Sequence, residues 1–171
     1  MSENTNPYTL SFGKQPPQMV SRFYEMQNIL DAFTGEPPSN QVYILTGVRG
    51  SGKTVTMTGI ANDLQSDKDW IVVNLTAEYD LVESLAAELG EKKELKKFFK
   101  LEGLSVSLRG ITIDIKNTLP VTDAKVAVSK MLKLIKKKGK KELVTLDEVS
   151  NNGSVKNFAN EYLTHSLFSL Y

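Results

Sequence analysis

The octapeptide at positions 47–54 constrains this chain more than any other stretch. It reads Gly-Val-Arg-Gly-Ser-Gly-Lys-Thr and fits the pattern Gly-x-x-x-x-Gly-Lys-[Ser/Thr] without a mismatch. Residues 42–45 before it form an apolar, β-branched run that is typical of a buried parallel strand. Apolar residues after it repeat at the spacing of one helix face: Met57, Ile60, Ala61 and Leu64. A strand, a glycine loop and a helix in this order are the context of a phosphate-binding loop.

The residue types in this loop suit the binding of an anion. Glycines let backbone N–H groups curl around it, and a helix N-terminus adds further N–H groups and partial positive charge. Lys53 would contact the β- and γ-phosphates, and the Thr54 hydroxyl would ligate Mg²⁺. A turn that only links a strand to a helix would explain the glycines but not the Lys-Thr pair. We expect nucleoside triphosphate binding by Gly47, Val48, Arg49, Gly50, Ser51, Gly52, Lys53, Thr54 and Val55.

A second motif follows much later in the chain. Residues 143–146 form a four-residue apolar run that ends in Asp147 and Glu148, which is the Walker B pattern. Asp147 would hold the Mg²⁺ shell together with Thr54, and Glu148 would orient or deprotonate the attacking water. Acidic residues end many strands, so the pattern is weak alone. With the loop upstream it indicates an ATPase in which Glu148 and Lys53 are catalytic.

The rest of the chain alternates helices and strands. Residues 1–19, rich in proline, read as an extended strap, and residues 20–171 as the core. Helical spacing predicts a helix around 23–33 stopped by Gly35, one from Leu81 with a break near Gly90, one from Thr122 or Asp123, and a last one over 155–170. Residues 70–75 predict a second buried strand. Residues 103–117 alternate around Arg109-Gly110 and predict an inserted β-hairpin that packs on the body or on a partner.

Composition excludes several classes of site. The 171 residues suit one domain, and 21 basic against 20 acidic residues give a net charge of +1. The absence of cysteine and the single histidine exclude disulfides, thiolate sites and histidine clusters. With no signal peptide and no membrane-length apolar run, we expect a soluble cytoplasmic protein without membrane contact. The lysine runs at 92–100 and 136–141 are most simply solvated helix faces, and nucleic-acid binding is the unsupported alternative.

With both motifs placed, the chain resembles the N-terminal part of an AAA+/STAND-like P-loop ATPase of the prokaryotic group related to archaeal ATPases and origin-recognition proteins. The motifs at 47–54 and 143–149 carry the resemblance, and residues 21–25 are similar to the Arg-x-x-Glu helix of that group. It covers residues 7–165 and implies a three-layer α/β/α core with a mostly parallel sheet. It also implies that Met19, Val20 and Arg22 lie near the adenine.

The resemblance implies a five-stranded sheet in the order 5-1-4-3-2, of which three strands are legible here. The sequence ends near the helix that should lead to the next strand, so we expect a core incomplete at its C-terminus, without the sensor residue, arginine finger and lid. An incomplete sheet and an exposed hairpin would favour self-association or a protein partner. Direct pairing of the 143–146 and 42–45 strands would instead indicate the kinase/GTPase branch, against which Asp-Glu argues.

These expectations favour a domain that binds ATP and Mg²⁺ but hydrolyses ATP slowly. Loss of a charge-stabilising arginine alone costs about 10³–10⁵ in rate. The alternative is a nucleotide-dependent switch or scaffold with little or no catalysis. A small-molecule kinase fits less well, because no acceptor pocket or lid arginine cluster follows the loop.

Overall fold

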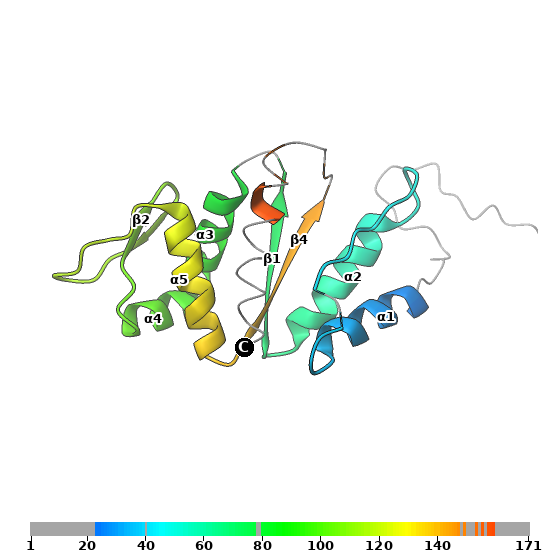
Figure 1. The fold of residues 1–171 in the computed structure, drawn as a ribbon, viewed down its shortest axis with the longest axis horizontal. Helices are drawn as coiled ribbons and strands as arrows, with labels where there is room; N and C mark the ends of the chain where they lie inside the picture. The colour runs from blue at the N-terminus through cyan, green and yellow to red at the C-terminus, as the bar shows by residue number, and fades with distance from the viewer. Residues whose placement is uncertain are drawn as a thin grey trace, which may run out of the picture. The chain divides into compact units, whose positions relative to one another are not determined.

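The computed structural model describes residues 23–39, 41–77, 80–147, 149, 153, 155 and 157–159. The chain divides between Ile60 and Ala61 into two compact units, which we describe separately. The elements in chain order are α1 (Phe23–Thr34), α2 (Lys53–Ser66), β1 (Trp70–Thr76), α3 (Leu81–Glu91), α4 (Lys93–Leu101), β2 (Val106–Leu108), β3 (Ile111–Ile113), α5 (Ala124–Lys137) and β4 (Lys141–Asp147) (Figure 1). The strap expected at residues 1–19 lies outside the described residues.

Helix α1 packs in the first unit through a narrow apolar stripe. Ile29 and Ala32 are its buried side chains, and the helix ends where the Gly35 N–H donates to the Asp31 carbonyl at 3.0 Å. The helix expected around 23–33 is therefore confirmed, with Gly35 at its C-terminal end.

The segment before the octapeptide is not a strand. Residues 42–46 form neither helix nor strand, and the side chains of Val42 and Ile44 are 51% and 82% exposed. The prediction of a buried strand at 42–45 is wrong for this structure. A β-branched run becomes a strand only when a neighbouring strand bonds its N–H and C=O groups, and propensity alone does not supply that neighbour. Tyr43 instead makes an edge-to-face contact with Phe33 of α1, with ring centroids 5.3 Å apart.

The second unit is built on a parallel pair of strands. β1 and β4 pair in register from Trp70 opposite Lys141 to Thr76 opposite Asp147, and they form a two-stranded sheet within the described residues. The chain is thus an α/β protein with a parallel sheet, as expected. The order 5-1-4-3-2 places these two strands side by side, and the observed pair agrees with it.

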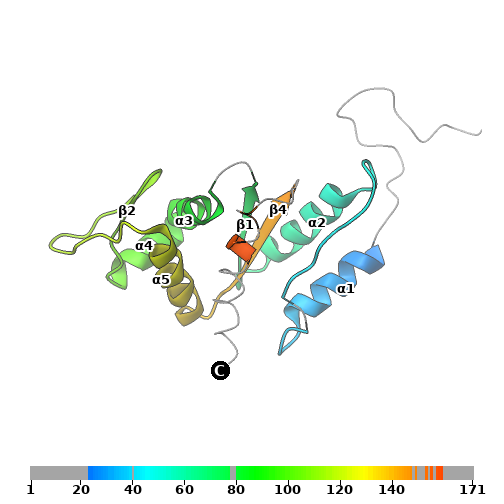
Figure 2. The same ribbon diagram turned by 45° about the horizontal axis from the view of Figure 1, so that its top comes forward.

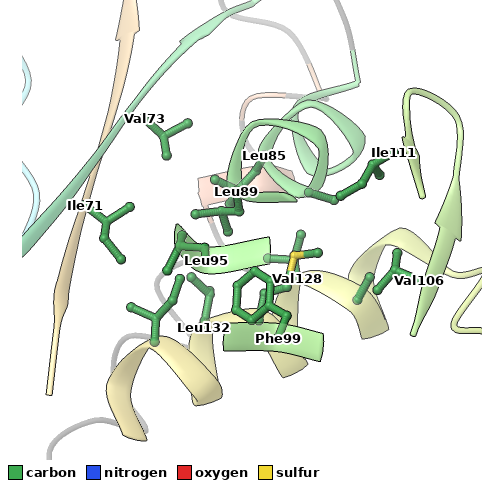
Figure 3. Close-up of a cluster of buried hydrophobic side chains, with 14 of the residues drawn as sticks. Ile71, Val73, Leu85, Leu89, Leu95, Phe99, Val106, Ile111, Val128 and Leu132 are labelled. Atoms are coloured by element: carbon green, nitrogen blue, oxygen red, sulfur yellow. The ribbon is translucent and has the colours of Figure 1, made fainter. Parts of the chain in front are cut away.

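Helices α3, α4 and α5 cover one face of this pair (Figures 1 and 2). Alternate β1 residues Ile71, Val73 and Leu75 point into the core that these helices form with the sheet. Figure 3 shows Phe99 of α4 in the middle of this cluster, and Phe99 is fully buried. The largest body of buried apolar side chains in the described residues therefore lies in the second unit.

A small hairpin packs against the outer side of α3 and α4. β2 and β3 pair antiparallel around Gly110, whose φ is 84°, and Val106 and Ile113 are fully buried. Ile111 lies against Gly90 of α3, where an added Cβ would come within 1.5 Å of the Ile111 Cδ1 atom. The hairpin expected within residues 103–117 forms, and it packs on the body of the protein. Gly90 serves this contact. α3 continues to Glu91, and the break expected near Gly90 falls at Lys92.

Capping residues fix where two of these helices start. The Asp80 carboxylate accepts the N–H groups of Val82 and Glu83, both at 2.9 Å, and starts α3. The Asp123 carboxylate accepts the Val126 N–H at 2.9 Å and starts α5. α5 ends before Gly139, whose φ of 74° suits glycine.

Most of the helix expected at 155–170 lies outside the described residues. No described helix is long and apolar enough to cross a bilayer.

Candidate functional site: the glycine loop at the start of helix α2

Residues 47–54, which we call the glycine loop, contain three glycines, and the backbone needs glycine at all three positions. The φ angles of Gly47, Gly50 and Gly52 are 151°, 80° and 83°, in the region that residues with a Cβ rarely adopt. At Gly47 a Cβ would also lie 2.7 Å from the Ser51 Oγ atom. The three glycines are therefore a requirement of the loop's path.

The Lys53 side chain bonds to the backbone at the start of its own loop. Its ammonium group donates to the carbonyl oxygens of Gly47, at 2.8 Å, and Val48, at 3.0 Å. The cation is thus held by neutral acceptors inside the loop. A phosphate group would offer the same ammonium a charged acceptor, and charge-assisted hydrogen bonds are the stronger kind.

Ser51 contributes a polar atom that the protein does not satisfy. Its Oγ atom is buried and has no hydrogen-bond partner. Leaving a buried hydroxyl unpaired costs about 1–3 kcal/mol, so such atoms call for a specific explanation. A hydroxyl oriented into a glycine-lined loop beside a lysine fits an anionic ligand that accepts its hydrogen bond. The donor set of the loop therefore fits a phosphate group.

The loop runs directly into α2. Helix α2 begins at Lys53, and both the N–H and the hydroxyl of Thr56 donate to the Gly52 carbonyl, at 2.9 and 3.0 Å. A helix start presents N–H groups that have no acceptor within the helix, and the helix dipole adds positive potential there. Val48 and Val55 are 79% and 54% exposed, so their side chains face solvent.

Asp147, the expected metal ligand, is the last residue of β4. It lies opposite Thr76 of β1. Both residues are therefore at the carboxyl ends of the two parallel strands, where ligands of open α/β sheets bind. The Thr145 hydroxyl donates to the Asn74 side-chain oxygen Oδ1 at 2.6 Å on the same strand pair. The sequence interpretation missed Asn74 and Thr76. The sequence signal for these two polar residues was that they alternate with apolar residues at the end of the 70–75 run.

Four expected site residues cannot be placed. Glu148, the proposed base, and Met19, Val20 and Arg22, the proposed adenine pocket, lie outside the described residues. Within the described residues, no three His, Cys, Asp or Glu side chains form a group that could hold a metal ion.

A comparison with protein families identifies the chain. A family model described as an ATPase domain predominantly from Archaea matches residues 19–171, which is almost the whole sequence. The chain belongs to this archaeal-type ATPase family. No curated protein and no solved structure matches it significantly. Family membership makes the chain an ATP-binding P-loop domain.

Proposed function

We propose that this archaeal-type ATPase domain binds ATP with Mg²⁺ at the glycine loop and hydrolyses it. The observation that carries the proposal is the buried, unpaired hydroxyl of Ser51 in a loop closed by Lys53. The three left-handed glycines support it, because they give the loop a backbone path open to an anion. Because residues 22–25 fit the Arg-x-x-Glu pattern, we also propose that the domain belongs to the AAA+/STAND-like group.

Each residue of the site has a proposed role. Lys53 would exchange its two carbonyl acceptors for phosphate oxygens and stabilise the charge on the transferred group. Thr54 and Asp147 are the proposed Mg²⁺ ligands, and bound Mg²⁺ would neutralise phosphate charge. Glu148 would take the proton of the attacking water. Met19, Val20 and Arg22 are proposed to contact the adenine.

Calorimetry of ATP·Mg²⁺ binding tests the site. We compare the unaltered chain with Lys53→Ala, and with Lys116→Ala as a control that removes an exposed lysine from the loop after β3. The loop lysine contributes a charge-assisted hydrogen bond, so Lys53→Ala should weaken binding by about 10- to 100-fold. The control should bind as the unaltered chain does. Equal affinity of Lys53→Ala and the unaltered chain would disprove the proposal.

Phosphate release from the same samples tests the proposed base. Glu148→Gln keeps the size of the side chain but cannot accept a proton, so turnover should fall by about 10²–10⁴ while ATP binding persists. Unchanged release from Glu148→Gln would remove Glu148 from the mechanism and leave the binding proposal intact.

A nucleotide-dependent switch is the second candidate, and one observation favours it. Residues 42–44 have a strand-like sequence but form no strand, and Val42 and Ile44 are mostly exposed. A segment of this kind can change state at low cost when a ligand orders the adjoining loop. ATP·Mg²⁺ that slows amide exchange in residues 42–46, without multiple turnovers, would favour the switch over the ATPase.

A further inference from the structure

The net charge of +1 conceals a strong division of charge along the chain. Residues 92–102 and 130–142 together hold twelve lysines and three glutamates, for a net charge of +9. The remaining residues hold nine basic and seventeen acidic side chains, for a net charge of −8. We call the twelve lysines the lysine surface: Lys92, Lys93, Lys96, Lys97, Lys100, Lys130, Lys133, Lys136, Lys137, Lys138, Lys140 and Lys141.

The fold of the second unit brings the two lysine-rich segments together. Lys137 of α5 forms an ion pair with Glu102, directly after α4. The Lys138 ammonium lies 4.9 Å from the centre of the Phe98 ring of α4. Lys92, Lys93 and Lys140 line one pocket of about 250 Å³ beside the start of β1. α4 and the end of α5 are therefore neighbours (Figure 2), and lysines of the two segments meet at this pocket.

Helical spacing directs these lysines outward. On α4 they repeat at the spacing of one helix face: Lys93, Lys96, Lys97 and Lys100. The opposite face of α4 buries Leu95 and Phe99 in the core. On α5, Lys133, Lys136 and Lys137 are exposed while the alternating apolar residues are buried.

Few carboxylates neutralise this surface. Glu102 is paired with Lys137, and Glu91, at its margin, lies 3.8 Å from Lys96. Glu94 is exposed and lines the pocket described above. Burial raises the pKa of Glu142 to about 7, so at neutral pH this side chain carries only part of its charge. The residues outside the described part of the chain hold three basic and four acidic side chains, so their sequence contains no acidic segment that could balance the lysines.

We propose that the lysine surface binds the phosphate backbone of double-helical nucleic acid without reading its sequence. Lysine is a point charge suited to phosphate, and phosphate contacts supply sequence-independent affinity. The two segments contain no arginine, asparagine or glutamine, the side chains that most often read base edges. This binding is distinct from nucleotide binding at the glycine loop and does not depend on it.

The side chains around the lysines disfavour two other polyanions. Single strands are held by stacking on exposed aromatic rings. Phe98 and Trp70 are only partly exposed and lie under Lys138 and Lys141, and Phe99 is fully buried. Binding to an anionic membrane by an amphipathic helix needs a row of apolar side chains to insert, and α4 commits Leu95 and Phe99 to the core. One exposed leucine of α4, Leu101, is too little apolar surface for that role.

Fluorescence anisotropy across a salt series tests the proposal. The probe is a labelled DNA duplex of roughly 25 base pairs and arbitrary sequence. The test variant carries Lys97→Gln, Lys100→Gln and Lys133→Gln, all exposed lysines of the surface. The control variant carries Arg109→Gln, Lys116→Gln and Lys125→Gln, which removes the same charge from exposed positions outside the lysine surface. Each lost phosphate contact should lower the slope of log affinity against log salt by about 0.9, so the test variant should lose about 2–3 from the slope.

The expected result is salt-sensitive duplex binding by the unaltered chain and by the control, weakened at least about 10-fold in the test variant at 0.1 M salt. Circular dichroism should show all three proteins folded, since the changed side chains are exposed. Equal weakening in both variants would overturn the proposal, because it would show a general charge effect. Two other results would also overturn the proposal. In the first, the unaltered chain binds phosphatidylserine vesicles but not the duplex. In the second, it does not bind the duplex and sedimentation shows a dimer that only the test variant loses.

Discussion

Ser51 illustrates how one atom can have opposite effects on stability and on binding. Its hydroxyl is buried without a partner in the glycine loop, so the folded protein carries the cost of desolvating it. A ligand that accepts its hydrogen bond would recover that cost. Sequence reasoning could place Ser51 in the loop from the motif, but it could not show that the hydroxyl lacks an acceptor, because that depends on the path of the folded loop.

Ser51→Ala should therefore separate the two effects. Without nucleotide, the variant should be as stable as the unaltered chain or up to about 1 kcal/mol more stable, because an unsatisfied group is removed. Its affinity for ATP·Mg²⁺ should fall by about 10-fold or more, because a hydrogen bond to a charged group is lost. Thermal unfolding and calorimetry measure the two quantities. A less stable variant with unchanged affinity would contradict the interpretation of Ser51 as a ligand contact.

Glu142 gives the fold a predictable pH dependence. Burial raises its pKa from 4.5 to about 7, with its own backbone and Lys136 partly opposing the shift. Below the unfolded pKa both states are protonated. As pH rises from about 4.5 to about 7 the unfolded state loses the proton first, so the stability contributed by Glu142 falls and then levels off.

Glu142→Gln should remove this pH dependence. The variant should be about 1–3 kcal/mol more stable than the unaltered chain at pH 8, and the difference should shrink towards pH 5. Denaturant unfolding at the two pH values measures it. Glu88→Gln, at an exposed position of α3, is the control and should follow the unaltered chain. A constant difference at both pH values would mean that Glu142 does not titrate with a raised pKa.

At the scale of elements, the contact between α3 and the hairpin depends on one missing methyl group. A Cβ at Gly90 would meet the Ile111 side chain at 1.5 Å. Ile111 is 3% exposed in a packed core, so its side chain has little room to move aside. The sequence predicted a helix break near Gly90, and the break falls at Lys92. The packing role of Gly90 could not be predicted, because Ile111 is distant in sequence and reaches Gly90 only through the hairpin.

Gly90→Ala should destabilise the protein by about 1–3 kcal/mol through overpacking, although alanine is the better helix former. In an Ile111→Ala background the same substitution should cost little or become favourable, because Cδ1 and Cγ1 are gone. A double-mutant cycle from denaturant unfolding measures the coupling. Additive effects of the two substitutions would show that the Gly90–Ile111 contact does not limit packing.

The sequence predicted elements well where local signals decide them. The helices follow from apolar spacing and from caps such as Asp123, and the β1 and β4 strands from compact apolar runs. The strand expected at 42–45 failed because pairing with a neighbour decides it. The break expected near Gly90 falls at Lys92, with φ −65° and ψ 109°. The lysine surface likewise joins two segments that the sequence keeps apart.

At the scale of the whole molecule, the apolar core is concentrated in the second unit. The buried cluster runs from Ile71 to Phe158 and draws on α3, α4, α5, both parallel strands and the hairpin. The glycine loop lies in the first unit, where Ile29, Ala32 and Ile60 are among the few buried apolar side chains. Stability therefore differs along the chain, with the ligand-binding segment in the less densely packed part.

Amide hydrogen exchange should reveal this difference. Without nucleotide, exchange should be slowest in α3, α5 and β1 and fast in residues 41–52. Saturating ATP·Mg²⁺, at about 100 times its Kd, should slow exchange at residues 47–56 and add about 2.7 kcal/mol of stability by linkage. Mass spectrometry of peptides with and without nucleotide measures both effects. A loop as slow as α5 before nucleotide is added would contradict the expected division of stability.

The charge division has a practical consequence for handling the protein. An ion-exchange resin contacts one face of a protein at a time, so local charge governs retention more than the total. With +9 in the two lysine-rich segments and −8 elsewhere, a chain of net charge +1 should be retained at neutral pH by both a sulfonate and a quaternary-amine resin. Retention on the sulfonate resin would then depend on the lysines, and nucleic acid bound to them would weaken it.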